Sequence, residues 1–367
     1  MELELFFELI QLSIGTRDTL SRVPQADEWG ELYKAARKQT LVGVCFAGIQ
    51  RLYDSQRGMV ESFPETLKKK WITETLMISR NNERLNYRCV ELQTQLAKDG
   101  FKTYIMKGQG NAALYGDTLC KLRQPGDIDI FLDGGFKRVM AYVNDTFPSN
   151  EVNELEIHYH CFKDVEVEIH YKPFIVRDFI RNARLQRFFR SKSKECFENR
   201  IGLPNNAGEI VVPTPEFNIV HQLVHIKHHL FSDGIGLRQL MDYCFVLRDA
   251  RAKLVNTENA LKVIHSLGMD CFAKSLMWVL QKVFALESDV LLWQPDEKHG
   301  YFLLAEILRK GNFAQMVENK HPHNKMWNFF SINAKAISFA CFDSTAWFWT
   351  PIWRIWNFCW RKLKGYK

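Results

Sequence analysis

The spacing of apolar residues divides the chain into regions of different periodicity. In residues 1–99 apolar side chains recur at helical spacing, which predicts roughly four helices that end at the stop signal Gly100. Over the next seventy or so residues the apolar runs become short and alternate with polar residues, as they do in strands. After Pro173 the helical period returns and continues to the end of the chain.

The strand-like region is predicted to be a small mixed core. The expected order of elements is strand, helix, strand, helix, strand, strand, over residues 101–108, 109–117, 128–132, 134–147, 154–162 and 165–171. The last two strands are separated only by Lys163 and Asp164, so they are expected to form an antiparallel hairpin.

The predicted fold class is therefore α+β. A mixed α/β core at residues 100–172 is flanked by an N-terminal helical region, 1–99, and a C-terminal helical region, 213–367. Residues 173–212 between them are expected to hold a basic helix and a linker, because glycine, proline and asparagine cluster at 199–215.

Two aspartates stand on either side of one isoleucine where the second strand begins. In RQPGDIDIFL, residues 123–132, Asp127 and Asp129 share a face of the strand, about 6 to 7 Å apart. Phe131 continues that face as an apolar residue, so the face is not simply solvated. Two carboxylates this close repel one another unless a cation lies between them, which favours a divalent-metal site over a pair of surface charges.

Two other stretches supply complementary groups. In VEVEIHY, residues 165–171, the alternation places Glu166, Glu168 and His170 on one face, so a third carboxylate is at hand for one or two magnesium ions. In KGQGNAAL, which begins at Lys107, a glycine turn leads into a helix N-terminus, where backbone N–H groups favour a phosphate.

Composition narrows the class of protein. The chain has 367 residues, 46% hydrophobic and 25% charged, with a net charge of +7, which is compatible with a phosphate-bearing ligand but does not require nucleic acid. Its nine scattered cysteines contain no CxxC pair, which is typical of free thiols in a reducing compartment. Acidic residues near the N-terminus and the lack of a long apolar stretch make a cytoplasmic location the expectation.

Three further patterns have both a functional and a structural interpretation. His221 and His225 lie one turn apart, but no HExxH glutamate accompanies them, so packing or lining of an acceptor cleft is favoured over zinc. The arginines in residues 171–200 are interpreted as the solvated face of an amphipathic helix, with an RNA-binding strip as the alternative. The tryptophan stripe in 347–364 is expected to pack on the helical region or a partner, with peripheral membrane contact as the alternative.

The chain resembles the uncharacterised bacterial nucleotidyltransferases of the DNA polymerase beta superfamily over about residues 100–245. The matching features, in chain order, are Lys107-Gly108, a short helix ending in Leu114-Tyr115, Arg123, Gly126-Asp127-Ile128-Asp129, Glu168-Ile169-His170 and the helical stretch 221–243.

The resemblance implies a nucleotidyltransferase-type core whose site residues can be carried over by position. The expected catalytic residues and metal ligands are Asp127, Asp129 and Glu168, with Glu166 as the alternative third carboxylate. The expected nucleotide-binding residues are Lys107, Gly108, Gln109, Gly110 and Arg123, of which Lys107 and Arg123 have structural ion pairs as their alternative. Gln109 departs from the Gly-Gly or Gly-Ser that the superfamily usually has in this turn.

We therefore expect a metal-dependent nucleotidyltransferase, using Mg²⁺ or Mn²⁺. It would move a nucleoside monophosphate from a nucleoside triphosphate to an unidentified small molecule, protein or RNA, with release of pyrophosphate. Asp129→Asn is expected to abolish transfer and to leave the thermal midpoint unchanged or raised, because it relieves carboxylate repulsion. The alternatives are a non-catalytic binding or scaffold protein with the same fold, and transfer of the γ-phosphate to a small molecule.

Overall fold

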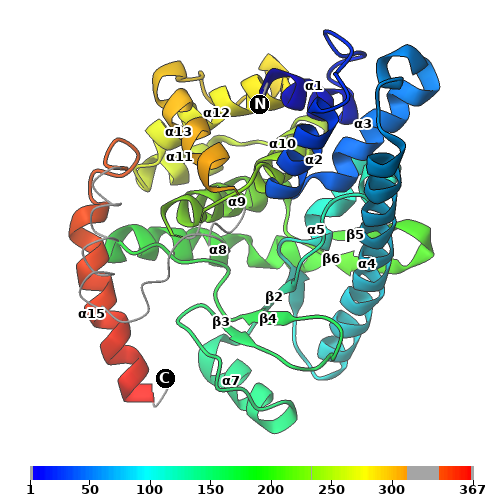
Figure 1. The fold of residues 1–367 in the computed structure, drawn as a ribbon. Coiled ribbons are helices and arrows are strands. Elements are labelled where there is room, and N and C mark those ends of the chain that lie inside the picture. Colours follow the sequence, from blue (N-terminus) through cyan, green and yellow to red (C-terminus); the bar gives the residue numbers. More distant parts are fainter. Residues whose placement is uncertain (1–2, 233, 312–338, 365–367) are drawn as a thin grey trace, which may run out of the picture.

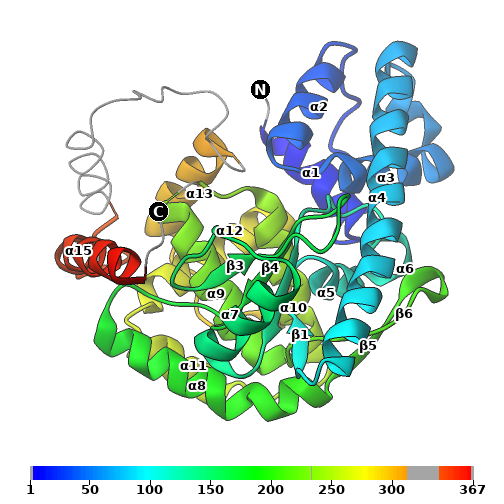
Figure 2. The ribbon, with the colours of Figure 1, turned by 90° about the horizontal axis from the view of Figure 1, so that it is seen from below.

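Helices form the N-terminal part, as the periodicity predicts. The computed structural model describes residues 3–232, 234–311 and 339–364, and its first α-helices are α1 (Leu3–Ser13), α2 (Glu28–Lys38), α3 (Val42–Ser55) and α4 (Glu65–Lys98), with a 3-10 turn η1 (Arg57–Val60) before α4. Helix α4 has 34 residues and runs along one side of the molecule in both views (Figures 1 and 2). The indole of Trp71 in α4 donates to the carbonyl oxygen of Val42 at 2.8 Å, which fixes α4 against α3.

A four-stranded mixed sheet follows, with the strand order β1-β2-β4-β3. The strands are β1 (Thr103–Ile105), β2 (Ile128–Leu132), β3 (Glu156–His158) and β4 (Val167–His170). Strands β2 and β4 are parallel, whereas β1–β2 and β3–β4 are antiparallel. The predicted hairpin of the last two strands is thus confirmed, and the fold is a mixture of helix and sheet of the α+β kind.

Helical segments connect the strands in the predicted order. The first connection contains α5 (Gln109–Ala112), η2 (Ala113–Tyr115) and α6 (Gly116–Leu119), and the second contains α7 (Gly135–Thr146). One face of the sheet is covered by α7, where Val139 and Val143 pack with Ile128, Ile130 and Leu132 in a cluster of buried side chains. Apolar residues of α4 close the same cluster.

The other face of the sheet is apolar at one end and polar at the other. Phe131 stacks on Tyr104 with 4.7 Å between the ring centroids, and Tyr104 also meets the edge of Phe217 at 5.6 Å. This aromatic layer belongs to the larger of the two buried clusters, which extends through the N-terminal and C-terminal helices. Asp129, two residues before Phe131, lies where this packing stops, so the polar end of the face is left for a site.

Helices resume after the sheet and build the C-terminal part. They are α8 (Phe179–Glu198), α9 (Pro215–Phe231), α10 (Leu237–Ala252), α11 (Glu258–Ser266), α12 (Asp270–Phe284), the 3-10 turn η4 (Ser288–Val290), α13 (Glu297–Lys310) and α15 (Ala346–Lys364). Helices α9 and α10 contact each other, and α10 also contacts α5 and η2, which brings them to the start of the sheet region.

The segment at 199–215 is not a structureless connection. Its composition favoured a linker, but β5 (Arg200–Leu203) and β6 (Gly208–Val211) form an antiparallel hairpin around the 3-10 turn η3 (Pro204–Asn206). The amide side chain of Gln93 in α4 exchanges two hydrogen bonds with the backbone of Val211, at 2.9 and 3.1 Å. The glycine and asparagine residues serve the tight turn, since Asn205 and Asn206 both have positive φ.

The basic and tryptophan-rich segments contact each other. In α8, Arg181 pairs with Asp343 at 3.1 Å and Arg184 donates to the carbonyl oxygen of Ser266 at 2.7 Å. The rings of Trp349, Trp353 and Trp356 in α15 surround that of Phe179, with centroids 5.5 to 5.7 Å away. The predicted packing of the tryptophan stripe on the helical region is confirmed, and α15 lies along the outside of the molecule (Figure 1).

None of the helices in the described ranges combines the length and the apolar character needed to cross a membrane.

Candidate nucleotide and metal site

A cavity of about 240 Å³ lies between the polar end of the sheet and the helices α9 and α10. Six residues predicted from the sequence line it: Lys107, Gly108, Arg123, Asp127, Asp129 and Glu168. The opposite wall comes from α9 and α10 and includes Gln222, His225, His228, His229, Arg238 and Gln239. Segments more than a hundred residues apart therefore meet at one site.

Strand pairing places the carboxylates next to one another. Asp129 and Glu168 are direct partners in the parallel ladder between β2 and β4, so their side chains leave the sheet on the same face. Asp127 stands just before β2 and lines the same cavity. Glu166 is exposed and contributes its backbone carbonyl oxygen to the amide of Ile128 at 3.0 Å. Of the two glutamates considered for the third carboxylate, Glu168 is the one that lines the cavity.

Asp129 is the most enclosed of the acidic groups, with a side chain 3% exposed. Its Oδ1 lies 2.6 Å from Nζ of Lys107 and 3.0 Å from Nε2 of His170. Burial raises the pKa of this carboxyl, but the Lys107 ammonium and the His170 ring outweigh burial and hold the pKa well below its usual range. Asp129 therefore carries a full negative charge that two cationic groups already neutralise.

Asp127 is in the opposite situation. The negative charge of Asp129 and, after it, burial raise the pKa of Asp127 above its usual value. Burial also raises the pKa of Glu168. The repulsion expected from the sequence raises the pKa of Asp127, whereas at Asp129 the neighbouring Lys107 and His170 outweigh the effects that raise the pKa. The expectation that Asp129→Asn leaves the thermal midpoint unchanged or raised therefore needs correction, because Asp129 compensates buried positive charge.

The tripeptide Glu-Ile-His occurs twice, and the two copies pair with each other. In the antiparallel ladder between β3 and β4, Glu156 faces His170 and His158 faces Glu168. Nε2 of His170 lies 3.2 Å from the Glu156 carboxylate and 3.8 Å from that of Glu168. Burial lowers the pKa of His170, but Glu156 and Asp129 raise it more, to about 9, so the ring is a cation at neutral pH.

These side chains fit a divalent metal. One ligand atom each from Asp129, Glu168 and His170 lie within 4.8 Å of one another, and Glu156, His158 and Glu168 form a second such group. Glu168 belongs to both groups. Carboxylate oxygens are ligands that hard divalent cations take, whereas the protonated ring of His170 pairs with these carboxylates and is not itself a ligand in that state.

Lys107 is held between the acidic strand and the histidine wall. Its ammonium lies 3.3 Å from Nε2 of His225, in addition to its contact with Asp129. Burial and the nearby positive charge of Lys107 lower the pKa of His225 well below its usual value, so this ring is neutral and accepts a hydrogen bond from the ammonium. Burial lowers the pKa of Lys107, but the carboxylates outweigh burial and raise it.

The glycine turn after Lys107 has a conformation that suits only glycine. Gly108 has a φ of 54° and a Cβ there would lie 3.3 Å from the carbonyl oxygen of Asp127. Gly110 is also confined, since a Cβ would lie 3.0 Å from the carbonyl oxygen of Ile105. The side chain of Gln109 is buried and donates to Asn86 and Asn82 of α4, so the residue that departs from the usual Gly-Gly or Gly-Ser anchors the turn to α4.

Arg123 is engaged in an ion pair inside the protein. Its Nε and Nη2 each donate to a carboxylate oxygen of Asp242 at 2.7 Å, and its side chain is 4% exposed. Tyr115 donates to the same carboxylate at 2.6 Å. This bidentate geometry favours the structural alternative for Arg123, although the residue also borders the cavity.

The four histidines of α9 pack inside the protein or line the cavity. His221 lies 3.2 Å from the carbonyl oxygen of Pro173, and burial lowers its pKa to about 3. His225 lies 3.0 Å from His229, and both line the cavity. Neither His221 nor His225 belongs to a described group of three or more metal-ligating side chains. This agrees with packing and cleft lining, the interpretation preferred from the sequence.

A family described as an uncharacterised nucleotidyltransferase matches residues 25–285. The chain belongs to this nucleotidyltransferase family. The match covers the N-terminal helices from α2 onward, the sheet and the cavity, and it ends just after α12. The searches of curated proteins and of solved structures return no match.

Several residues of this nucleotidyltransferase site were not found by sequence reasoning. Glu156 and His158 had a signal, since the repeated Glu-Ile-His on two strands of one predicted hairpin places each glutamate opposite a histidine. Arg238, whose pKa is lowered to about 10 by burial and by Arg123, lines the cavity from α10. Nothing local in the sequence connects α10 with β2, because their approach depends on the packing of the whole molecule.

Proposed function

We propose that this member of the nucleotidyltransferase family transfers a nucleoside monophosphate from a nucleoside triphosphate to an acceptor, with release of pyrophosphate. The observation that carries the proposal is the register of β2 and β4, which puts Asp129 beside Glu168 at the cavity that Asp127 also lines. In a polymerase beta-like core, such an acidic pair and a third carboxylate on a neighbouring strand would act together on the bound nucleotide.

In this proposal Asp127, Asp129 and Glu168 hold Mg²⁺ or Mn²⁺. When bound, the metal would neutralise triphosphate charge and stabilise the charge that develops on the attacking and leaving oxygens. His170 contacts Asp129 at 3.0 Å and Glu156 at 3.2 Å, so it orients the carboxylate that binds the metal.

The cationic and backbone groups would position the phosphates. Lys107 supplies an ammonium at the edge of the acidic cluster, and the Gly108 turn allows close approach of a phosphate to the backbone. Arg238 faces the same cavity from α10 and provides a second cation at the opposite wall. An acceptor hydroxyl or phosphate would attack the α-phosphorus in line, and the pyrophosphate would leave toward these cations.

The acceptor side of the cavity is formed by α9 and α10. Gln222, His228 and Gln239 present amide and imidazole groups there. These groups would bind a polar acceptor by hydrogen bonds, and the acceptor could be a small molecule, a protein or an RNA.

The test uses α-labelled and γ-labelled nucleoside triphosphates, each with Mg²⁺ or Mn²⁺ and a lysate of the host. The wild type is compared with the Asp127→Asn/Asp129→Asn double variant and with Asp133→Asn, which removes a carboxylate just past β2 that bonds the amide of Lys102. Transfer of the α-label by wild type and Asp133→Asn, but not by the double variant, is the expected result.

Two other outcomes would redirect the proposal. Transfer of the γ-label with formation of a nucleoside diphosphate would show phosphotransfer. No transfer, together with triphosphate binding that does not respond to the metal, would point to a scaffold in which Lys107 and His170 permanently neutralise Asp129.

A further inference from the structure

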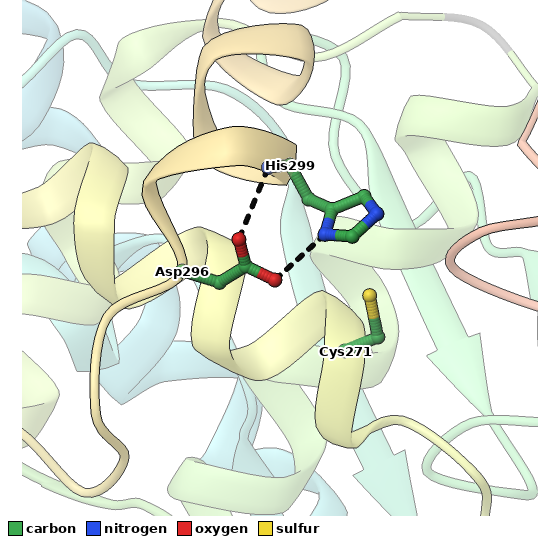
Figure 3. A group of neighbouring side chains, drawn as sticks. All are labelled: Cys271, Asp296 and His299. Carbon is green, nitrogen blue, oxygen red and sulfur yellow. Dashed lines mark hydrogen bonds and ion pairs between the residues drawn. The ribbon is translucent and has the colours of Figure 1, made fainter.

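A second group of potential metal ligands lies in the C-terminal helices and shares no residue with the cavity. Cys271 is the second residue of α12, Asp296 is the N-cap of α13, and His299 lies in the first turn of α13. One ligand atom from each lies within 4.8 Å of the others. The three side chains converge, with the thiol of Cys271 facing the carboxylate and the imidazole (Figure 3).

Local structure explains the Asp296–His299 pair but not the cysteine. One oxygen of Asp296 caps the backbone N–H of His299 at 3.2 Å, and the other lies 2.6 Å from Nδ1 of the same residue. The amide of Asp296 donates to the carbonyl oxygen of Lys274 at 3.1 Å, which ties the loop to α12. This hydrogen bond places Asp296, the N-cap of α13, beside the thiol of Cys271. Capping of the helix does not require a thiol at that position.

A second thiol, that of Cys341 in the C-terminal segment, lies near this group without belonging to it. Cys341 is exposed, and the neighbouring ring of Phe342 packs against Phe272 at 5.6 Å and against His299 at 6.3 Å between centroids. Burial and, after it, the proximity of Cys341 raise the pKa of the Cys271 thiol. Both cysteines are free thiols.

We propose that Cys271, Asp296 and His299 bind a zinc ion, with Cys341 as the fourth ligand. Thiolate, imidazole and carboxylate are the donors that zinc takes in tetrahedral sites. With zinc–nitrogen and zinc–oxygen bonds of about 2.0 Å, a tetrahedral site needs ~3.3 Å between the nitrogen and the oxygen. The Asp296–His299 contact of 2.6 Å therefore opens by roughly 0.7 Å, and zinc replaces the proton between these groups.

The site would connect two parts of the chain. Residues 25–285 match the nucleotidyltransferase family, and Cys271 is the one proposed ligand inside that range. Asp296 and His299 lie just beyond it, and Cys341 comes from the segment that leads into α15. Zinc would thus fasten the C-terminal segment to the family core, independently of the transfer reaction.

The test is a cobalt titration of the full-length, reduced and chelator-treated protein. Cobalt bound through thiolates gives a sulfur-to-metal charge-transfer absorption in the near ultraviolet, which the carboxylate and histidine groups of the cavity cannot produce. We expect one equivalent of cobalt to develop this absorption and one equivalent of zinc to remove it. Inductively coupled plasma mass spectrometry should then find one zinc per chain.

Single variants assign the ligands. Cys271→Ser should lower zinc affinity by more than ~100-fold, since loss of a group that merely supports a ligand already lowers affinity by about 10–100-fold. Cys341→Ser should weaken the thiolate absorption to about half, as expected when one of two such ligands is lost. Two matched controls should bind zinc as the wild type does. Cys359→Ser changes an exposed cysteine of α15, and His265→Gln changes the histidine of a similar His–Asp pair whose groups lie 2.9 Å apart.

The wild-type spectrum decides the proposal even if a variant fails to fold. A wild type without thiolate absorption at one equivalent of cobalt would overturn it, as would a folded Cys271→Ser protein with an unchanged spectrum. An unchanged spectrum in Cys341→Ser would overturn the fourth ligand.

Discussion

Asp127 and Asp129 are separated by one residue, and we predict that replacing each by asparagine has a different effect on stability. Asp129→Asn removes the negative charge next to Lys107 and His170, which are 2.6 and 3.0 Å away. Asp127→Asn removes a carboxyl whose pKa is raised by the charge of Asp129 and by burial. In metal-free protein the first change leaves buried cations without compensation, and the second relieves repulsion.

The size of the effect follows from the burial of the pair. Breaking a buried ion pair by removing one partner lowers the free energy of unfolding by about 3–5 kcal/mol. Asparagine still accepts a hydrogen bond, so we take ~3 kcal/mol for Asp129→Asn. An unfolding entropy of roughly 2.1 cal/mol/K per residue over 367 residues converts this loss into a decrease of about 4 °C in the thermal midpoint. Asp127→Asn should leave the midpoint unchanged or slightly higher.

The assay is thermal and urea unfolding of the wild type and the two single variants in the presence of a chelator. Transfer is measured in parallel with Mg²⁺ or Mn²⁺, and both variants should lose it. Equal midpoints for the two variants would refute the reasoning, because the charge of Asp129 would then not compensate Lys107 and His170. A larger decrease for Asp127→Asn would refute it as well.

Three further predictions follow from the same region. The pKa of His170 is raised to about 9, so the protonated ring stabilises metal-free protein by at most about 3 kcal/mol. This stabilisation is complete below pH 6.5 and is lost as the pH rises through 9. Urea unfolding from pH 6 to 10 should show the loss for the wild type, and His170→Asn should flatten it. Arg123→Met should lower the free energy of unfolding by about 3–5 kcal/mol, because it leaves Asp242 buried without its partner, and a loss below 1 kcal/mol in urea melts would contradict the buried pair. Glu168→Gln should reduce transfer by at least ~100-fold, as removal of a group that acts on the transition state does. Glu166 is exposed, so the activity of Glu166→Gln should stay within about threefold of the wild type in the same labelled assay.

The secondary structure of the sheet region could be predicted because its apolar runs are short and differ clearly from the helical period on either side. The run from Ile128 to Leu132 is apolar except for Asp129, the later Val-Glu-Val-Glu-Ile-His stretch alternates with a period of two, and both contain strands. The pairing of β2 with β4 in parallel could not be read from this pattern, since it requires that β3 take the edge position. The hairpin at 200–211 was missed because its glycine and asparagine residues, which serve the turn, also indicate a linker.

The acidic half of the cavity could likewise be predicted, and the opposite half only in part. The acidic half consists of Asp127, Asp129 and Glu168, which the local spacing of residues in the sequence already placed on strand faces. Lys107 was expected to contact phosphate or an ion-pair partner, but that its partner is Asp129 depends on the three-dimensional course of the turn. The contact between Arg123 and Asp242 joins positions 119 residues apart, and no periodicity links them.

Helix α4 has a mechanical consequence. It extends about 50 Å at 1.5 Å per residue. Trp71 fastens it to α3 near one end, and Gln93 fastens it to β6 near the other. A hinge between the N-terminal helices and the sheet would have to bend this rod, so the two parts are expected to turn as one rigid body. A spectroscopic label on the N-terminal helices would accordingly report the orientation of the strands that carry Asp129 and Glu168, even though it sits far from the chemistry.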